Sequence, residues 1–453
     1  MTDFTPVTMS VIGCGYLGAV HAAAMAHLGH DVIGVDTDPA RTLLLTQGKA
    51  PIFEPGLDEI LAAGEQSGRL RFTTDFAAVA PATIHFICVG TPQMAGTLAA
   101  DLTQLESAID ALIPVLKPGD VVVGKSTVPV GTAAGLAERI RRVQPGATLV
   151  WNPEFLREGF AIEDTLRPDR IVFGLGDDPA SIDAGDQLRR AYGPILGSIP
   201  LVVTDYQTAE LVKVAANAFL ATKISFINAV ADVCDLVGAD VVELAGALGH
   251  DTRIGRRFLN AGLGFGGGCL PKDIRAFMAR AEELGADQIV AFLREVDSVN
   301  RRRREKVVAI VQEWLGGSVS GKRIAVLGAA FKPDSDDIRD SPALEVAESL
   351  YVMGAEVVVT DPRAIPNAKR QSPRLTYAVT AEEAATSADV VLLLTEWREF
   401  LELDPEVLGK VTHARRVLDA RNSLDVTRWV AAGWEYRGLG RPAAGAEHAS
   451  PTR

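Results

Sequence analysis

The residues best suited to chemistry lie in one glycine-rich stretch that leads to a cysteine. The stretch reads Gly262-Leu263-Gly264-Phe265-Gly266-Gly267-Gly268-Cys269-Leu270-Pro271-Lys272-Asp273. Glycine lets a backbone approach a ligand closely, so the run is expected to leave room for a substrate and to present the Cys269 thiol to it. Lys272 or another nearby cation could favour the thiolate, which is the nucleophilic form. A buried inert thiol and a metal ligand are the alternatives to this nucleophile.

A second glycine motif lies near the N-terminus. Gly13-Cys14-Gly15-Tyr16-Leu17-Gly18 follows an apolar, β-branched run and opens a helical pattern, and Asp36 ends the next strand-like run. Gly13 would allow a tight turn, Gly15 the approach of a pyrophosphate, and Gly18 close packing of helix on strand. Asp36 would accept hydrogen bonds from the adenosine ribose, which favours NAD over NADP. A nicotinamide cofactor and a presented thiol together suggest an oxidation through a covalent intermediate.

Polar residues elsewhere are also candidates. Lys213 and Asn217 are four residues apart on a predicted helix and so share one face, where a lysine that extends to solvent is the alternative interpretation. Residues 125–132 and 152–159 each follow a predicted strand, the position where loops of parallel sheets carry active-site groups, although loop capping could explain them.

Two charged segments lie in the C-terminal half. In residues 331–342, Lys332 and Arg339 suit anionic ligand groups, whereas the acidic residues between them are interpreted as capping a loop. The run Arg301-Arg302-Arg303-Arg304 is interpreted as a solvated helix face.

Composition limits the function classes. The chain has 453 residues, more than one hydrophobic core usually holds, so two or three domains are expected. A net charge of −13 argues against nonspecific binding of nucleic acid or anionic membranes. The four cysteines form no CxxC pair, so neither disulfides nor a metal site is expected, and Cys14, Cys88 and Cys234 are interpreted as packing residues. No leader and no apolar run of membrane-spanning length is recognised, so a cytoplasmic protein is expected.

Strand-like and helical runs alternate in both halves of the chain, which is typical of parallel sheets with crossover helices. We expect an α/β fold with two Rossmann-like domains joined by a helical segment that contains a long central helix over residues 205–237. The expected segments are 1–204, 205–300, 301–440 and a disordered tail over 441–453. The predicted strands are residues 7–12, 31–36, 84–89, 121–124, 148–150, 171–174, 322–327, 355–360 and 389–395.

Taken together, the motifs resemble the nucleotide-sugar dehydrogenases of the UDP-glucose/GDP-mannose dehydrogenase family, and most closely its UDP-glucose 6-dehydrogenases. The resemblance covers residues 7–422 and includes the helix with Lys213 and Asn217. It rests on the segments GCGYLG (13–18), CVGTP (88–92), KSTVPVGT (125–132), NPEFLREG (152–159), RPDRIVFG (167–174), RIGRRFLNAGLGFGGGCLPKD (253–273) and FKPDSDDIRDSP (331–342).

The resemblance implies an NAD domain, a helical dimerisation segment and a C-terminal nucleotide-sugar domain, with the active site in the cleft between them. It implies a twofold oxidation of the sugar C6 alcohol to a carboxylate with two NAD per turnover, and a homodimer or higher oligomer. The implied catalytic residues are Cys269, Lys213, Asp273, Glu154, Thr127 and Asn217. The implied NAD-binding residues are Gly13, Gly15, Tyr16, Leu17, Gly18, Asp36, Thr91, Thr127, Glu158 and Arg339. The implied substrate-binding residues are Glu154, Phe155, Leu156, Lys213, Asn217, Arg253 (toward the neighbouring subunit), Phe265, Gly266, Lys332 and Arg421.

Other readings of the sequence remain open at this point. A related dehydrogenase could act on GDP-mannose or on a UDP-N-acetylhexosamine. An isomerase, epimerase or reductase could use the same cofactor fold, but it would need no thiol nucleophile at Cys269. An inactive scaffold would have no reason to keep Lys213, Asp273 and Cys269 together.

Overall fold

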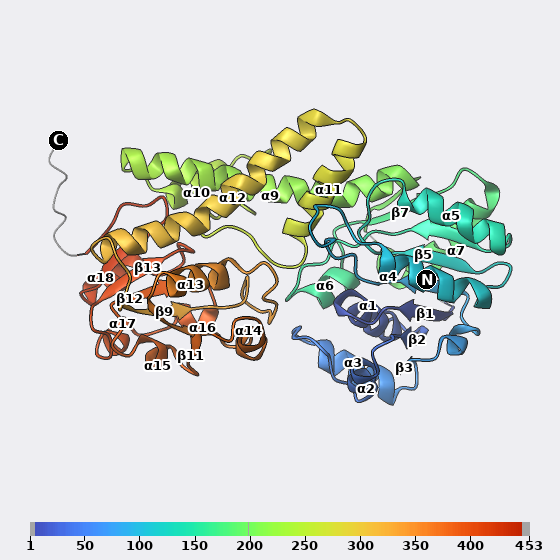
Figure 1. Cartoon of the computed structure of the whole chain (residues 1–453). Coiled ribbons are helices and arrows are strands. Elements are labelled where there is room, and N and C mark those ends of the chain that lie inside the picture. The colour runs from blue at the N-terminus through green and yellow to red at the C-terminus, as the bar shows by residue number, and fades with distance from the viewer. Residues whose placement is uncertain (1–4, 198, 446–453) are drawn as a thin grey trace. The chain divides into compact units, whose positions relative to one another are not determined.

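The computed structural model describes residues 5–197 and 199–445 (Figure 1). The chain forms two compact units, and each is described by itself. The N-terminal unit contains residues 1–216 and 275–285, and the C-terminal unit contains residues 217–274 and 286–453.

A parallel sheet organises the N-terminal unit. In the described residues it has eight strands in the order β3-β2-β1-β4-β5-β6-β7-β8. Neighbouring strands are parallel except β6 and β7, which are antiparallel. The strands are β1 (Thr8–Ile12), β2 (Asp31–Val35), β3 (Leu70–Thr73), β4 (Ile84–Ile87), β5 (Val121–Gly124), β6 (Thr148–Trp151), β7 (Ile171–Leu175) and β8 (Leu201–Asp205).

Both faces of this sheet are covered, because its strands are apolar on both sides. Met9 and Val11 of β1 pack in one buried cluster with Val20 of α1, whereas Ile12 packs in a second with Leu136 of α5. The N-terminal helices are α1 (Tyr16–His27), α2 (Pro39–Thr46), α3 (Leu57–Gln66), α4 (Thr103–Leu112), α5 (Thr132–Val143), α6 (Ala161–Leu166), α7 (Pro179–Ala191) and α8 (Gly193–Leu196), with the 3-10 helices η1 (Phe76–Val79) and η2 (Ile113–Val115).

The C-terminal unit repeats this arrangement with a smaller sheet. Its described strands are all parallel, in the order β11-β10-β9-β12-β13-β14. The strands are β9 (Arg323–Leu327), β10 (Glu356–Thr360), β11 (Thr376–Tyr377), β12 (Val390–Leu393), β13 (Arg416–Asp419) and β14 (Glu435–Gly438). The helices around it are α13 (Pro342–Val352), α14 (Ile365–Gln371), α15 (Ala381–Ala385), α16 (Arg398–Leu401), α17 (Pro405–Leu408) and α18 (Val426–Ala431).

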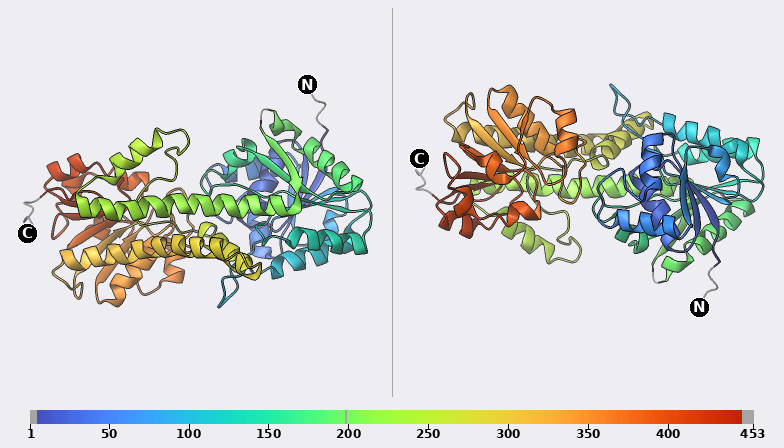
Figure 2. Two further views of the ribbon diagram at one scale, coloured as in Figure 1. Left: turned by 90° about the horizontal axis from the view of Figure 1, so that it is seen from above. Right: turned by 90° about the horizontal axis from the view of Figure 1, so that it is seen from below.

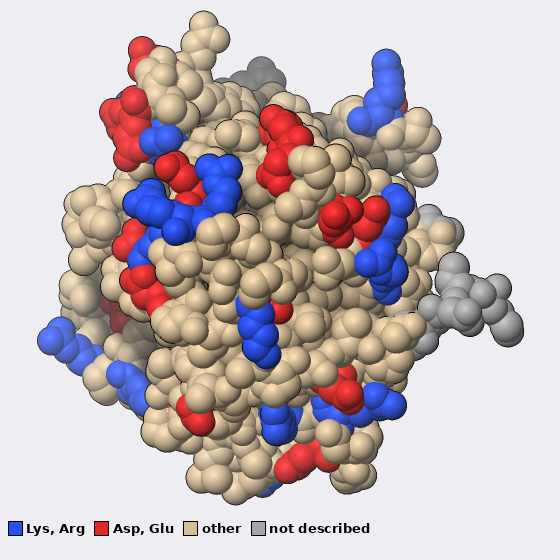
Figure 3. Space-filling view, turned by 90° about the vertical axis from the view of Figure 1, so that its right-hand side faces the viewer, with Lys and Arg blue, Asp and Glu red and all other residues tan. Residues whose placement is uncertain are grey.

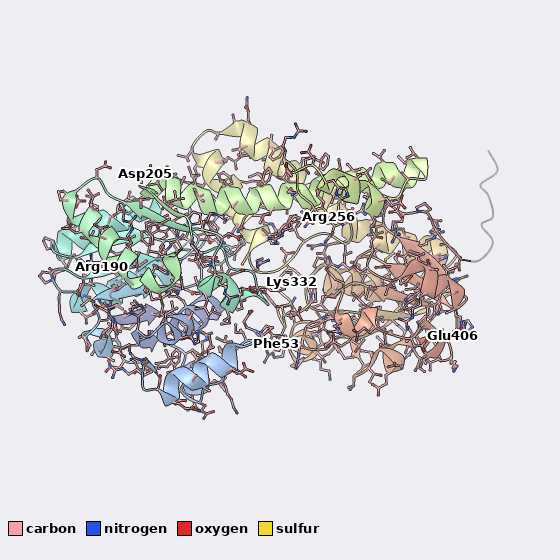
Figure 4. All side chains as sticks on the ribbon, turned by 180° about the vertical axis from the view of Figure 1, so that it is seen from behind. Phe53, Arg190, Asp205, Arg256, Lys332 and Glu406 are labelled. Atoms are coloured by element: carbon pink, nitrogen blue, oxygen red, sulfur yellow. The ribbon has the colours of Figure 1, made fainter. Side chains whose placement is uncertain are left out.

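Four helices lie between the two sheets in sequence: α9 (Tyr206–Val237), α10 (Val241–Gly249), α11 (Leu270–Glu283) and α12 (Asp287–Trp314). Asp205, at the end of β8, directly precedes α9 (Figure 4). Within the C-terminal unit α9 and α12 run side by side, where the Ser225 hydroxyl donates to the carbonyl of Val296 at 2.7 Å (Figure 2). The sequence prediction that no apolar segment is long enough to cross a membrane is wrong for α9, which is 32 residues long and passes by length and composition. Of its most apolar window 44% is buried within the protein.

The expected fold class is confirmed. The predicted strands and the long helix occur within a few residues of their expected positions, but short strands such as β8, β11 and β14 escaped prediction. β8 is largely exposed and β11 has only two residues, so neither shows a buried apolar run. The disordered tail expected from residue 441 begins too early, because Ala444 pairs with Tyr436 of β14. The rest of that tail lies outside the described residues.

In the C-terminal unit, the residue that corresponds to Asp36 is Asp361, and its carboxylate binds groups of its own unit. Asp361 follows β10 as Asp36 follows β2, and it is 5% exposed. One oxygen of its carboxylate accepts the backbone N–H groups of Ala329 and Ala330 and the indole N–H of Trp397, and the other accepts two N–H groups of its own turn. The carboxylate therefore ties the turn after β9 to β10.

We predict that Asp361→Ala lowers the free energy of unfolding by about 2–4 kcal/mol, because buried N–H groups left without an acceptor cost about 1–3 kcal/mol each. Urea denaturation followed by tryptophan fluorescence measures this directly, since Trp397 contacts the carboxylate. Glu399→Ala, at an exposed position, serves as the control. Equal stability of the two variants would show that Asp361 does not hold the turn.

Candidate active site

The glycine motif after β1 forms a tight turn that packs against the neighbouring strands. Gly13 has φ +85°, and a Cβ there would lie 2.7 Å from Cγ1 of Val89. A Cβ on Gly18 would clash with the carbonyl oxygen of Gly13. Both glycines are therefore required by the chain itself, as the sequence predicted for a turn and a close helix–strand contact.

Gly15 differs from these two glycines. Apart from Gly15 and its two chain neighbours, no residue in the described part of the chain has a heavy atom within 4 Å of the position that a Gly15 Cβ would take. Gly15 also caps α1, whose first turn starts with Tyr16 and Leu17, and a glycine supplies no side-chain cap to that turn. A helix N-terminus beside open space suits a pyrophosphate, so the turn fits a dinucleotide.

Asp36 is buried and already has partners. Its carboxylate accepts from the backbone N–H groups of Cys14 at 2.8 Å and Asp38 at 2.9 Å, and it pairs with the guanidinium of Arg41 at 2.9 Å. Sequence reasoning missed Arg41, although an arginine five residues beyond the acidic position was a visible signal. The ion pair offsets part of the negative charge that Asp36 presents to the ribose position.

Two loops at the carboxyl ends of β4 and β5 are joined. The hydroxyl of Thr91 donates to the carbonyl of Thr127 at 2.7 Å, and that of Ser126 donates to the carbonyl of Val89 at 2.7 Å. Thr91 is buried and Thr127 is half-buried. The structure thus brings two residues predicted for NAD binding into direct contact.

Lys213 and Glu154 form a buried ion pair. Nζ of Lys213 lies 2.9 Å from Oε1 of Glu154 and 5.7 Å from the ring centre of Phe155. Burial raises the pKa of the Glu154 carboxyl, but Lys213 and the N–H of Leu156 outweigh it and hold the pKa below its usual range. Lys213 is 5% exposed, so the alternative of a lysine extending to solvent is wrong.

Glu54 links two of the predicted motifs and was not foreseen. Its carboxylate accepts the hydroxyl of Tyr16 at 2.5 Å and the backbone N–H groups of Gly159 at 2.7 Å and Ala161 at 2.8 Å. The glycine turn is thereby tied to the loop that carries Glu154 and the half-buried Glu158. Only the tertiary contact identifies it, because Glu54 lies in a loop far from both segments in sequence.

Glu210 holds the helix that follows the Thr127 loop. It lies on α9 and accepts the backbone N–H groups of Gly131 and Ala133, both at 2.7 Å, at the start of α5. Arg280 approaches the same turn and donates to the carbonyl of Val130 at 3.0 Å. Burial raises the pKa of Glu210 to about 7, although the backbone N–H groups and Arg280 lower it.

In the C-terminal unit, Cys269 is the exposed member of the four free cysteines; Cys14, Cys88 and Cys234 are buried, as predicted for packing residues. Cys269 directly precedes α11, and its carbonyl accepts the N–H of Asp273 at 2.9 Å. The N-terminal end of a helix favours a negative charge, so this position suits a thiolate.

Asp273 is buried one turn into α11 and both of its carboxylate oxygens are bonded. Asn217 donates its amide to one oxygen at 2.6 Å, and Lys272 pairs with the other at 2.5 Å. The structure therefore brings two predicted catalytic residues, Asn217 and Asp273, into direct contact. Asp273 lies one helical turn after Cys269 in the sequence.

The glycines before Cys269 do not leave room for a ligand in the way expected. A Cβ on Gly262 would meet the carbonyl of Ala420, one on Gly264 the side chain of Asn300, and one on Gly266 the carbonyl of Asp340. Gly267 and Gly268 face Phe331 and Arg339 in the same way. Residues 261–267 are buried, so the missing side chains allow the protein's own segments to pack together.

The interpretation of the four-arginine run as a solvated face is wrong for two of its members. Arg301 and Arg302 are exposed, but Arg303 and Arg304 on α12 are 1% and 4% exposed. Arg303 pairs with Asp232, and Arg304 pairs with Asp340 and Glu345. Both also donate to the loop before Cys269, Arg303 to the carbonyl of Gly262 at 3.1 Å and Arg304 to that of Phe265 at 3.3 Å.

The remaining predicted substrate residues lie on the C-terminal unit. Arg253 is 87% exposed and pairs with Asp251 at 2.5 Å. Lys332 follows β9 and its Nζ lies 5.4 Å from the ring centre of Phe331 (Figure 4). Arg339, which was predicted to bind NAD, lies on this unit too and pairs with Asp337 at 2.6 Å.

Arg421 is used within the unit itself. Its guanidinium donates to the carbonyls of Leu394 at 2.7 Å, Gly264 at 3.0 Å and Phe331 at 3.2 Å, and pairs with Glu396 at 3.3 Å. These contacts hold three loop segments of the C-terminal unit together.

The predicted site residues thus form two groups, one on each unit. Within each group the structure brings neighbours together, as with Lys213 and Glu154 or Asn217 and Asp273. Among the residues that the structure describes, no group of three His, Cys, Asp or Glu side chains could hold a metal ion. On the face shown in Figure 3, basic and acidic side chains are interspersed.

The dinucleotide turn of the first Rossmann-like unit and the exposed thiol of the second define an NAD-dependent dehydrogenase. Three domain models of one family match the chain in order: the NAD binding domain over residues 7–195, the central domain over 207–302 and the UDP binding domain over 325–426. The chain belongs to the UDP-glucose/GDP-mannose dehydrogenase family.

Individual relatives cover nearly the whole chain. A UDP-glucose 6-dehydrogenase of Rhizobium meliloti is 43% identical over 438 residues, with 96% of this chain and 99% of the relative covered. A UDP-glucose dehydrogenase structure from Pyrobaculum islandicum has a TM-score of 0.89 at 38% identity, covering 98% and 99%. A UDP-D-ManNAc dehydrogenase structure from Pyrococcus horikoshii has a TM-score of 0.84 at 26% identity, covering 96% and 99%.

The Glu210 carboxyl gives a prediction about pH. Its pKa of about 7 in the folded protein is above the ordinary value of 4.5, so the folded state holds an extra proton between these values. The stability from this proton is present below pH 4.5 and is lost as the pH rises toward 7. We predict that Glu210→Gln removes this loss. The free energy of unfolding of the variant, relative to that of the wild type, should therefore rise by up to about 1.4 kcal/mol per pH unit across this range.

Urea unfolding of both proteins at pH 5, 6, 7 and 8 measures this difference. Glu138→Gln, an exposed change on α5, should follow the wild type at every pH. Parallel pH profiles for the wild type and Glu210→Gln would contradict the assignment.

Proposed function

We propose that this enzyme oxidises the C6 alcohol of UDP-glucose to the carboxylate of UDP-glucuronate, with two NAD per turnover and a covalent intermediate on Cys269. The observation that carries the proposal is the exposed Cys269 thiol at the N-terminal end of α11, in a chain with a UDP binding domain and a turn that fits a dinucleotide. UDP-glucose 6-dehydrogenases at 43% and 39% identity over nearly the full length support the sugar.

Bound NAD supplies the hydride acceptor for each of the two oxidations. After the first, the Cys269 thiolate adds to the aldehyde carbon and the oxygen takes a proton, which gives a thiohemiacetal. Loss of a second hydride and of the hydroxyl proton leaves a thioester. Water then adds to the thioester, the C–S bond breaks, and the carboxylate and free thiol are released. The covalent bond keeps the reactive aldehyde on the enzyme between the two steps.

We assign the other roles by charge and contact. Lys213 and Asn217 can donate to a developing oxyanion, and Asp273, Glu154 and Thr127 can handle protons and water. Lys213 keeps the pKa of the Glu154 carboxyl low, so the carboxylate stays ionised at neutral pH and can accept a hydrogen bond from water or substrate. Lys332, Arg253 and Arg421, with Phe155, Leu156, Phe265 and Gly266, are proposed to bind the nucleotide sugar.

A UDP-N-acetylhexosamine is the second candidate substrate. The fold match to a UDP-D-ManNAc dehydrogenase structure favours keeping it, although the identity is lower, at 26%. GDP-mannose is less favoured, because the relatives at 39–43% identity over nearly the full length are UDP-glucose 6-dehydrogenases.

We propose the domain organisation expected from the sequence, with residues 1–204 for NAD, 205–300 for dimerisation and 301–440 for the UDP-sugar. The ranges of the three family models support these boundaries. A cytoplasmic location stays a prediction.

A homodimer is supported by an apolar stripe on α9. Phe219, Phe226 and Val233 recur every seven residues and are more than half exposed, as are Leu236 and Val237. A contiguous apolar stripe of this kind on a globular protein marks an interface. We propose that a second copy of the chain covers it.

We predict that purified protein forms two NADH for each UDP-glucose consumed, measured by absorbance at limiting sugar. Cys269→Ala should lose this turnover by at least about 10³-fold, because the thioester cannot form. Thermal unfolding and NAD affinity should stay as in the wild type, which serves as the folding control.

Full activity of Cys269→Ala would exclude the covalent route. In a parallel panel of UDP-glucose, UDP-N-acetylglucosamine, UDP-N-acetylmannosamine and GDP-mannose, oxidation of another sugar alone would replace UDP-glucose as the substrate.

We predict that Phe226→Glu shifts the protein from dimer toward monomer, because it places a charge in the apolar stripe. Size-exclusion chromatography with light scattering at micromolar concentration measures the mass. Val407→Glu, an equivalent change at an exposed position on α17, should leave the mass unchanged. A monomeric wild type would contradict the proposed dimer.

A further inference from the structure

Asn300 makes an unusual pair of contacts with the loop before the thiol. It lies on α12 and is 1% exposed. Its amide oxygen accepts the backbone N–H of Phe265 at 2.8 Å, and its amide nitrogen donates to the carbonyl of the same residue at 2.9 Å. The Asn300 side chain thus makes the two backbone hydrogen bonds that a neighbouring strand would otherwise make with Phe265.

A glycine in the loop leaves the space that the Asn300 side chain occupies. Gly264 has φ +93°, a conformation that residues other than glycine rarely adopt. A Cβ at Gly264 would clash with the amide oxygen of Asn300. The glycine is therefore required both by its backbone conformation and by the presence of Asn300.

Other side chains hold the same loop from several directions. Arg304, one turn beyond Asn300, donates to the carbonyl of Phe265, and Gly267 donates its N–H to the carbonyl of Arg339 at 2.9 Å. Residues 261–267 are buried, whereas Cys269 is exposed. The buried loop therefore supports the backbone that leads to the exposed Cys269.

We propose that Asn300 is a positioning residue of the reaction, which holds the backbone of Phe265 and thereby sets the place and exposure of the Cys269 thiol. This inference rests on the proposed role of Cys269 as the nucleophile. A shift of about 1 Å in a reacting group can lower a rate about 100-fold, so a loose loop affects chemistry more than binding.

The test compares two substitutions at Asn300. Asn300→Asp keeps the volume and one acceptor but loses the donor to the Phe265 carbonyl, and Asn300→Ala loses both contacts. Arg302→Ala is the matched control, because Arg302 lies on the same helix, is exposed and bonds with Ser298 and Glu295 on that helix.

Three quantities are measured at 25 °C: the rate of Cys269 alkylation by iodoacetamide, located by mass spectrometry, kcat with UDP-glucose, and the affinity for NAD. Both Asn300 variants should change the alkylation rate several-fold and lower kcat about ten- to a hundredfold, with NAD affinity within about twofold of the wild type. Arg302→Ala should match the wild type in all three.

An Asn300→Asp protein with wild-type alkylation and kcat would overturn the proposal, and a lower melting temperature alone would then show a purely structural role. NAD affinity reports that the N-terminal unit is folded in each variant. A different experiment tests the proposed function: it fails if Cys269→Ala keeps its turnover. The alkylation rate needs no substrate, so it tests the role of Asn300 independently.

Discussion

The structure around the thiol depends on one constraint, which is that buried backbone polar groups must find hydrogen-bond partners. The loop over residues 261–267 has no helix or strand to supply them, and it is buried. Asn300, Arg303 and Arg304 of α12, together with Arg421, donate to or accept from its N–H and C=O groups instead. These contacts hold the loop from α12 and from the Arg421 segment, and Cys269 follows the loop immediately before α11.

Buried backbone groups of the N-terminal unit are paired in the same way, but by carboxylates in place of amides and guanidinium groups. Glu54 accepts N–H groups of the Glu154 loop together with the Tyr16 hydroxyl, and Glu210 accepts those at the start of α5. Each carboxylate connects segments that lie far apart in the sequence. Loops that carry functional residues are thus held by buried charged groups, and this explains why burial shifts the pKa of Glu210 upward while Lys213 shifts that of Glu154 downward.

The two Rossmann-like units show how one topology can serve different purposes. Both place an acidic residue after their second strand, Asp36 and Asp361, and both have a glycine turn after the first strand. Asp361 is filled by five donors from its own unit. At Gly15, in contrast, the N-terminal turn leaves open space beside a helix N-terminus, so the cofactor chemistry belongs to the N-terminal unit.

The sequence by itself determined the fold class, the NAD turn and the family, because these depend on local patterns: apolar alternation, glycine spacing and motif order. It also singled out Cys269 and the residues Lys213, Glu154, Asn217 and Asp273, but not which of them pair with each other. It did not determine the roles of Glu54, Asn300, Arg303 and Arg304, and it misjudged the arginine run and the purpose of the glycines. Those roles depend on contacts between segments distant in sequence. They are decided only when α12 packs against the loop before Cys269, and when Glu54 meets the loop after β6, because the buried polar groups there must be paired.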